Sequence, residues 1–264
     1  MITSLHSPHV EAVKALLGSR GSKERRQSGR YVIEGAQNIN SALSSAPDLV
    51  EKIYYTAESR EQINSPSWTG ELIEVAPNVM KAMSDTVTPQ GLIAVARISD
   101  LQISDFKNHS PKNSKIAYFW EIQDPGNAGT VIRAADAFGF DAVIFSNNSV
   151  DAYSPKVVRS TAGSFWNIPL FEDISEVQLL ELSNNLSLEV FATFAEADLS
   201  LKDAAQSCRE KGSIWIFGNE ARGIPNALLT KLNPTKVAIP MSGGAESLNL
   251  ATAASVVMYA VANA

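Results

Sequence analysis

Residues 237–262, which read VAIPMSGGAESLNLATAASVVMYAVA, decide the fold. The stretch begins with an apolar run at 237–239, which favours a strand and is ended by Pro240. A loop of small and polar residues follows, and its paired glycines allow the backbone to turn and to approach a ligand closely. The alanine-rich remainder predicts a buried helix, with Ser247 or Asn249 as its N-cap. Taken alone, the pattern is equally typical of an ordinary strand–loop–helix corner.

Two earlier stretches remove that ambiguity. The apolar residues 214–217 run directly into GNEARGIP at 218–225, and the apolar residues 116–120 are followed by EIQDPGNAGTVIRAA at 121–135. In this order and spacing, the three stretches resemble the signature motifs of the SpoU (TrmH-type) RNA ribose 2′-O-methyltransferases of the SPOUT superfamily. The resemblance extends from Lys115 to the C-terminus. It is specific because all three motifs occur together.

From Lys115 onward the chain repeats a strand, a glycine-bearing turn and a helix, a pattern that predicts an α/β fold with a parallel sheet covered by helices. The expected strands are 116–120, 142–145, 188–193, 214–217 and 236–239. Such sheets bind ligands beyond the carboxyl ends of their strands, and all three motifs follow strand ends. The resemblance also implies a deep trefoil knot at the C-terminus, which the pattern itself does not indicate.

The length of 264 residues suits two modest domains. We expect a smaller α/β domain at 1–98, a polar linker at 99–114 and the methyltransferase domain at 115–264. The phrases GRYVIEG at 29–35 and TPQG at 88–91 are similar to the substrate-binding domain that precedes many SpoU methyltransferases. That domain resembles small ribosomal RNA-binding proteins, so the resemblance implies that residues 1–98 bind the RNA substrate.

Composition limits the possible partners and compartment. A net charge of −6 argues against wholesale electrostatic wrapping of nucleic acid. The single cysteine, Cys208, excludes an intramolecular disulfide and fits a reducing cytoplasm. The first 20 residues lack a signal-peptide core, and no apolar run reaches the roughly 20 residues that a bilayer requires. The scattered histidines and cysteine offer no zinc-like cluster, so we expect neither a membrane partner nor a metal.

A basic segment near the N-terminus is the clearest candidate for an RNA contact. Up to residue 35 the chain carries six Lys or Arg against three Glu, or +3 (6 − 3), in a protein of net −6. We interpret residues 18–30 as a phosphate-contacting loop, because Lys and Arg that neutralise phosphates supply most non-specific affinity; a solvated charged loop is the alternative. With two residues of the family-like stretch SPKVVRSTAGS at 154–164, the predicted RNA contacts are Arg20, Lys23, Arg25, Arg26, Arg30, Lys156 and Arg159.

The three motifs also suit a cofactor with an activated methyl group. Turns built from small residues and backbone hydrogen-bonding groups fit adenine and ribose, and the resemblance implies S-adenosylmethionine as cofactor. The expected binding residues are Gly218, Ile239, Met241 and Leu248. Ile239 and Leu248 are also compatible with plain core positions. A dinucleotide-binding fold is the competitor, but Gly126-x-x-Gly129 lacks the G-x-G-x-x-G spacing.

The residues that the resemblance implies for catalysis are Asn127, Arg133, Glu220, Ser247 and Asn249. The family assigns activation of the ribose 2′-hydroxyl to the matching arginine. Arginine is a poor base, so we expect Arg133 to lower the pKa of the hydroxyl or to act with an RNA phosphate. Asn127 and Arg133 are six residues apart, so with a turn between them they need not share a helix face. A surface ion pair of Arg133 with Asp136 or Glu220 is the structural alternative.

We therefore expect a cytoplasmic, S-adenosylmethionine-dependent RNA ribose 2′-O-methyltransferase, with ribosomal RNA favoured over transfer RNA as substrate. The resemblance also implies that it works as a homodimer. Three alternatives remain: a transfer RNA ribose methyltransferase, a non-catalytic RNA-binding protein on the same fold, and a base methyltransferase of the superfamily. The full catalytic set speaks against the second, and the Asn–Arg pair disfavours the third.

Overall fold

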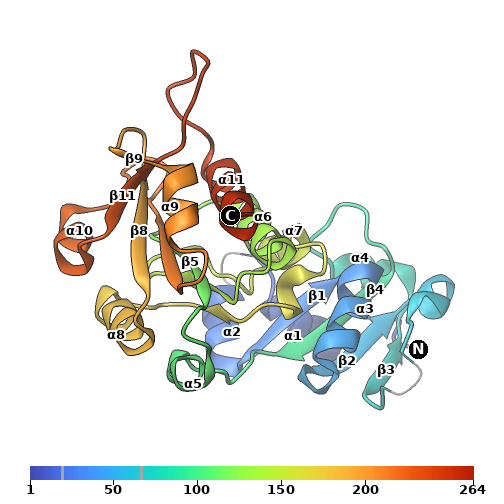
Figure 1. Cartoon of the computed structure of the whole chain (residues 1–264). Coiled ribbons are helices and arrows are strands. Elements are labelled where there is room, and N and C mark those ends of the chain that lie inside the picture. The colour runs from blue at the N-terminus through green and yellow to red at the C-terminus, as the bar shows by residue number, and fades with distance from the viewer. Residues whose placement is uncertain (19–20, 66–67) are drawn as a thin grey trace. The chain divides into compact units, whose positions relative to one another are not determined.

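The computed structural model describes residues 1–18, 21–65 and 68–264 (Figure 1). The chain divides into two compact units. Unit 1 comprises residues 1–100 together with 151–167, and unit 2 comprises residues 101–150 and 168–264. Residues 151–167, which lie between the first and second motifs in the sequence, therefore pack with the N-terminal residues.

Unit 1 is built on a four-stranded mixed sheet. Its strands are β1 (Arg30–Glu34), β2 (Val50–Tyr55), β3 (Glu71–Glu74) and β4 (Leu92–Arg97), in the order β1-β4-β2-β3. β4 pairs antiparallel with both β1 and β2, and β2 pairs parallel with β3. The helices of unit 1 are α1 (Pro8–Ala15), α2 (Gly21–Ser28), α3 (Ala36–Ser45), α4 (Pro77–Ala82) and α7 (Pro155–Ser160), with short 3-10 helices η1 (Pro47–Leu49), η2 (Ala57–Gln62) and η3 (Ser164–Trp166).

Residues 21–28 of the basic segment form a helix, whereas a loop is predicted from the sequence. The residues GSKERRQS form α2, because the Lys, Glu, Arg and Gln between the flanking Gly and Ser are good helix formers. Gly21 allows a close approach at its start, since a Cβ there would lie 2.6 Å from both the Leu16 carbonyl oxygen and the Arg25 guanidinium. α2 is therefore anchored to the end of α1.

Unit 2 is a seven-stranded, entirely parallel sheet in the order β7-β6-β5-β10-β8-β11-β9. Its strands are β5 (Lys115–Phe119), β6 (Ala142–Phe145), β7 (Leu170–Phe171), β8 (Glu189–Phe194), β9 (Leu199–Ser200), β10 (Ser213–Phe217) and β11 (Thr235–Ala238). Both faces are covered by helices, which is why the central strands are continuous apolar runs. The predicted parallel α/β class is confirmed.

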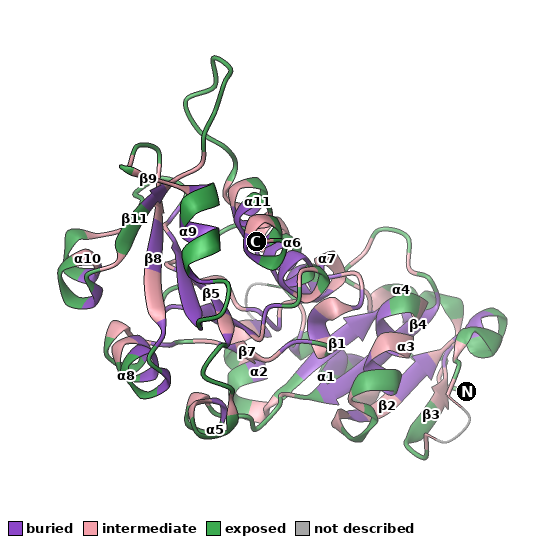
Figure 2. Ribbon diagram, in the orientation of Figure 1, coloured by how far each residue is buried: buried purple, intermediate pink, exposed green. Residues whose placement is uncertain are grey.

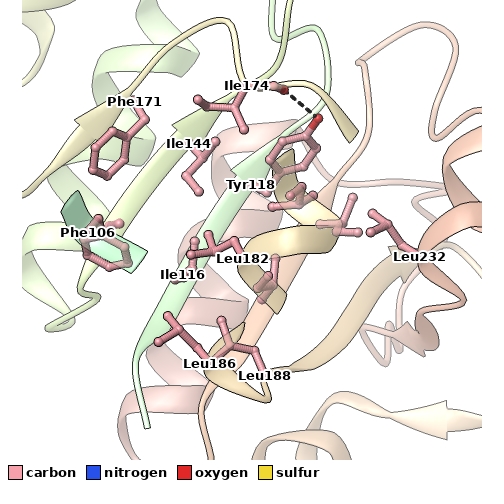
Figure 3. Packing of buried hydrophobic residues seen from close by; sticks show 14 of the residues in the cluster. Phe106, Ile116, Tyr118, Ile144, Phe171, Ile174, Leu182, Leu186, Leu188 and Leu232 are labelled. Atoms are coloured by element: carbon pink, nitrogen blue, oxygen red, sulfur yellow. Dashed lines mark hydrogen bonds between the residues drawn. The ribbon is translucent and has the colours of Figure 1, made fainter. Parts of the chain in front are cut away.

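Helices cover the two faces of this sheet separately. The helices of unit 2 are α5 (Ile103–His109), α6 (Pro125–Ala137), α8 (Glu176–Leu186), α9 (Leu201–Ser207), α10 (Asn226–Leu232) and α11 (Leu250–Ala262). Side chains of α5, α8 and α10 pack on Ile116, Tyr118 and the aligned residues of the neighbouring strands (Figure 3), where the Tyr118 hydroxyl donates to the Ile174 carbonyl at 3.4 Å. α6, α9 and α11 pack together on the other face.

All five strands predicted for unit 2 are present, with bounds within one residue. The short edge strands β7 and β9 were not predicted, because two-residue strands leave no periodic pattern. The segment 99–114, expected to be a linker, contains α5, whose Phe106 is buried in the core of unit 2. No helix in the described ranges is long and apolar enough to cross a membrane. The knot and the domain boundaries remain predictions.

Candidate active site

A pocket of about 470 Å³ lies in unit 2 at the carboxyl ends of β8, β10 and β11. Parallel strands end at one edge of a sheet, so loops that are distant in sequence meet there. The wall comes from the end of β8, from the 218–224 loop after β10, and from the loop after β11 with the start of α11. In Figures 1 and 2 this last loop, the red and mostly exposed segment before α11, extends away from the sheet of unit 2.

The loop after β10 is held in shape by Asn219. This side chain is 7% exposed; its Oδ1 accepts from the backbone N–H groups of Ala221 and Arg222, each at 3.0 Å, and its Nδ2 donates to the Glu121 carbonyl at 2.7 Å. Arg222 also forms an ion pair with Glu121. Gly218 is required beside it, since a Cβ there would lie 2.6 Å from the Gly223 backbone carbon. The loop thus presents a fixed backbone to the pocket.

Side chains from all three motifs form a continuous hydrogen-bond chain. Asn249 Nδ2 donates to Asn127 Oδ1 at 3.2 Å, and Asn127 Nδ2 donates to Glu220 Oε1 at 3.1 Å. Asn127 itself is fixed in the first turn of α6, where its backbone N–H donates to the N-cap Asp124 at 2.7 Å. Three of the five predicted catalytic residues are therefore in direct contact. Ser247 is exposed and lies on the pocket wall next to them.

Asn249 has two separable tasks. Its Oδ1 caps α11 by accepting from Ala251 N at 2.9 Å and Thr252 N at 3.3 Å, which confirms one of the two predicted caps, and its Nδ2 holds Asn127. We expect Asn249→Ala to lose about 1 kcal/mol of unfolding free energy through loss of the cap. Asn249→Asp keeps the capping oxygen but cannot donate, so we expect near-normal stability together with reduced methyl transfer. Urea denaturation and a methyl-transfer assay on both variants test this.

A matched cap elsewhere in unit 2 provides the control for that experiment. Ser175 caps α8 by accepting from Gln178 N at 3.4 Å and does not line the pocket. Ser175→Ala should lose a similar amount of stability with unchanged transfer. Full activity of Asn249→Asp would show that the bond to Asn127 is not needed.

Arg133 is placed apart from these residues. Asp124 caps α6 and Pro125 occupies its first turn, so Asn127 and Arg133 share one helix and the expected turn between them is absent. Six residues along a helix correspond to about 9 Å of rise. Arg133 is exposed, does not line the pocket and forms no ion pair with any described carboxylate; the alternative pairs with Asp136 and Glu220 are not formed.

The residues expected to hold the cofactor all line the pocket. Gly218, Ile239, Met241 and Leu248 are on its wall, and the side chains of Met241 and Leu248 are 38% and 37% exposed. Ile239 is half-buried. Exposed apolar side chains in a concave wall with backbone hydrogen-bonding groups fit a ligand with an apolar ring and polar edges. The residues present therefore suit S-adenosylmethionine.

Some contributors to the pocket were not predicted. Thr193 and Phe194, at the end of β8, line it, and Asn219 shapes it. Asn219 lies within a motif quoted above, so it carried a signal. The two β8 residues carried none, because nothing in the sequence reveals that β8 lies between β10 and β11. Among the described residues, no group of three or more His, Cys, Asp or Glu side chains is arranged to hold a metal ion.

The predicted RNA contacts are found in different environments within unit 1. Lys23, Arg26, Arg30 and Lys156 are exposed, although Arg30 pairs with Glu51 at 2.6 Å, a contact that raises the pKa of the Arg30 guanidinium. Arg159 is about one-quarter exposed and pairs with Glu34 and Asp85. Arg20 lies outside the described residues.

Arg25 is not available to RNA in this structure, contrary to expectation. Its side chain is 2% exposed, and its Nε and Nη2 donate to Asp151 Oδ2 at 2.9 and 2.7 Å. It also donates to the Leu16 carbonyl. Charge counting along the sequence did not anticipate this, because the partner is 126 residues away. Arg25 is a buried structural residue.

Comparison with known proteins agrees with this geometry. Residues 115–259 match the SpoU rRNA Methylase family, and residues 8–94 match the MRM3-like substrate binding domain. The chain is 32% identical over 238 residues to the 23S rRNA (guanosine(2553)-2′-O)-methyltransferase RlmP of Bacillus subtilis, and the aligned region covers 90% of each protein.

Solved structures of similar proteins extend over nearly the whole chain. The AdoMet-bound rRNA methyltransferase from Sinorhizobium meliloti has a TM-score of 0.84 at 26% identity and covers 98% of this chain and 96% of its own. The SpoU methyltransferase AviRb from Streptomyces viridochromogenes, in complex with AdoMet, has a TM-score of 0.83 at 25% identity, with 97% and 98% covered. The chain is a member of the SpoU rRNA methylase family.

Proposed function

We propose that this protein transfers a methyl group from S-adenosylmethionine to a ribose 2′-hydroxyl of ribosomal RNA. The observation that carries the proposal is the hydrogen-bond chain of Asn249, Asn127 and Glu220 beside the pocket of unit 2. Family membership and the rRNA 2′-O-methyltransferase activity of named relatives support it. A transfer RNA substrate is disfavoured, because these relatives act on 23S rRNA.

The bound cofactor supplies an activated methyl group on its sulfonium, so the protein's task is to bind, align and help a hydroxyl lose its proton. Gly218, Ile239, Met241 and Leu248 hold the cofactor. Glu220 and Asn249 fix the Asn127 amide, which positions the ribose.

Arg133 acts on the substrate. Its guanidinium is exposed and forms no ion pair with a described carboxylate, so it is free to stabilise the forming alkoxide or to hold a nearby phosphate. Ser247, on the pocket wall, contacts the substrate or the loop after β11.

The direct test uses the purified full chain, an unmodified 23S rRNA transcript and S-adenosylmethionine with a labelled methyl group. We expect label in the RNA and one alkali-resistant position, because 2′-O-methylation blocks cleavage at that nucleotide. Label on a base, or none, would contradict the proposal. A transfer RNA mixture serves as the competing substrate and is expected to remain unlabelled.

Leu248→Arg tests the cofactor pocket. The substitution replaces an apolar residue of the pocket wall by a longer, charged side chain, so we expect S-adenosylmethionine to bind at least about tenfold more weakly in calorimetry. Val177→Arg is the matched control, because Val177 is an exposed apolar residue of α8 that does not line the pocket. Equal affinity of both variants would place the cofactor elsewhere.

We also propose that the protein is a homodimer through unit 2. Ala251 and Ala254 of α11 face the monomer's own core, so the alanines themselves do not support the contact. Val256 and Tyr259 of the same helix do support the contact, because they are 38% and 59% exposed. The Tyr259 ring packs edge to face with Phe138 of α6, with 5.7 Å between the ring centroids. Light scattering should give about twice the chain mass of 28.4 kDa, and Tyr259→Glu should shift it towards one chain.

Unit 1 then supplies RNA affinity. Lys23, Arg26, Arg30 and Lys156 are its exposed predicted contacts, and phosphate contacts of this kind position a substrate without reading its sequence. Residues 1–98 as the RNA-binding domain and 115–264 as the transferase domain agree with the two matched families. A ribosomal RNA substrate supports the cytoplasmic location that we propose for the protein.

A further inference from the structure

Unit 1 contains a polar cavity of about 230 Å³ that the proposed reaction does not use. It lies where the N-terminal end of α3 meets the loop between α4 and β4 and the residues around α7. Glu34, Asn38, Thr88, Gln90 and Arg159 are on its wall. The volume is below the roughly 300–1,000 Å³ of pockets for drug-sized ligands and suits a smaller group.

A buried acceptor without a partner belongs to this wall. Asn38 is 7% exposed, and its Nδ2 donates to the Glu34 carbonyl at 3.2 Å. Its Oδ1 has no hydrogen-bond partner among the described residues. A buried acceptor without a partner is destabilising, so its presence in a cavity wall calls for a donor on a ligand.

The remaining wall offers both donors and acceptors. Gln90 Oε1 accepts weakly from Ala36 N at 3.4 Å, while its amide nitrogen makes no hydrogen bond within the described ranges. Arg159 donates to Glu34 at 3.4 Å, and Glu34 also accepts from Ser84 Oγ at 2.7 Å. A phosphate would require donors alone and would be repelled by Glu34. A nucleobase edge presents donors and acceptors together, which matches this wall.

The rim of the cavity adds an apolar contact. Val87 is 93% exposed in the loop between α4 and β4, next to the wall residue Thr88. Gly35 has φ 89° and lets α3 begin close to the loop, since a Cβ there would lie 2.9 Å from Gln90 Oε1. An exposed apolar side chain beside a polar cavity suits the flat face of a base.

We propose that this cavity accepts an unpaired nucleobase of the RNA substrate, so that unit 1 reads RNA sequence as well as contacting phosphates. The inference rests on the proposed function for the identity of the substrate. Asn38, Gln90 and Arg159 bind the base edge, and Val87 packs against the base or its neighbour. A base contact discriminates between sequences, whereas a phosphate contact does not.

The test compares RNA affinity and its salt dependence in the full chain. With an unmodified 23S rRNA transcript, Val87→Ala combined with Gln90→Ala should bind about tenfold more weakly, the size expected for losing a base hydrogen bond together with an apolar base contact. The slope of log affinity against log salt should be unchanged, since no phosphate contact is removed. Lys23→Ala with Arg26→Ala should instead lower that slope by roughly one unit per phosphate contact.

Gln206→Ala is the matched control, because Gln206 is an exposed glutamine of α9 in unit 2. Transcripts that contain 4-thiouridine or 6-thioguanosine should, on irradiation, cross-link to residues 84–91. Unchanged affinity of the double variant, a lowered salt slope, or cross-links confined to α2 would overturn the proposal. If the wild type binds but does not methylate, only the proposed function fails; if it methylates and the double variant binds normally, only this site fails.

Discussion

Arg25→Ala should destabilise the protein by about 3–5 kcal/mol, the cost of breaking a buried ion pair by removing one partner. Arg25 is 2% exposed and donates twice to Asp151, whose side chain is 14% exposed. Without the guanidinium, Asp151 Oδ2 keeps a negative charge in a mostly buried position, and the Leu16 carbonyl loses its donor as well. Urea denaturation of the variant and the wild type measures the difference.

Another basic residue of the same helix provides the control. Lys23 is exposed, and Lys23→Ala should change the unfolding free energy by no more than about 0.5 kcal/mol. Adding Asp151→Asn to Arg25→Ala should recover part of the loss, because a neutral amide is less costly to bury than a carboxylate. A loss below about 1 kcal/mol for Arg25→Ala would show that the pair does not anchor α2 and residue 151 together.

The pairing of Arg25 with Asp151 could not be predicted from the sequence. The basic run was visible, but sequence spacing does not distinguish an arginine that faces solvent from one buried against a carboxylate 126 residues later. The pairing depends on residues 151–167 belonging to unit 1. In the sequence these residues come after β6 and before β7, which are both strands of the unit 2 sheet. That excursion has no signature in composition or periodicity.

The sheet of unit 2 was predictable because its strands carry strong local signals. Apolar runs such as 214–217, ended by glycine-bearing loops, indicate buried parallel strands, and parallel strands bring their ends to one edge. The meeting of Asn127, Glu220 and Asn249 followed from that geometry together with the family resemblance. The order of the strands did not, so the β8 residues Thr193 and Phe194 were missed.

The start of α6 was misjudged for a local reason. A turn was expected between Asn127 and Arg133, whereas Asp124 as N-cap and Pro125 in the first turn start the helix ahead of Asn127. The consequence reaches the reaction: Asn127 and Arg133 stand on one rigid helix with a fixed separation. A change at either residue therefore leaves the other in place.

Arg133→Ala should lower single-turnover methyl transfer at saturating RNA and cofactor by about a hundredfold or more, the size expected when assistance to proton loss is removed. Arg133 is exposed and does not line the pocket, so the fold and the affinity for S-adenosylmethionine should be unchanged. Calorimetry with the cofactor and urea denaturation establish both points before rates are compared.

Two further variants separate chemistry from charge. Arg133→Lys keeps the positive charge but loses the planar fork of donors, so it should recover only part of the rate if the guanidinium binds the forming alkoxide. Arg209→Ala removes an exposed arginine of unit 2 that does not line the pocket, and it should transfer methyl groups at the wild-type rate. If Arg133→Ala also keeps the wild-type rate, Arg133 has no part in the reaction, and activation of the hydroxyl must come from Glu220, the one carboxylate in the Asn249–Asn127–Glu220 chain.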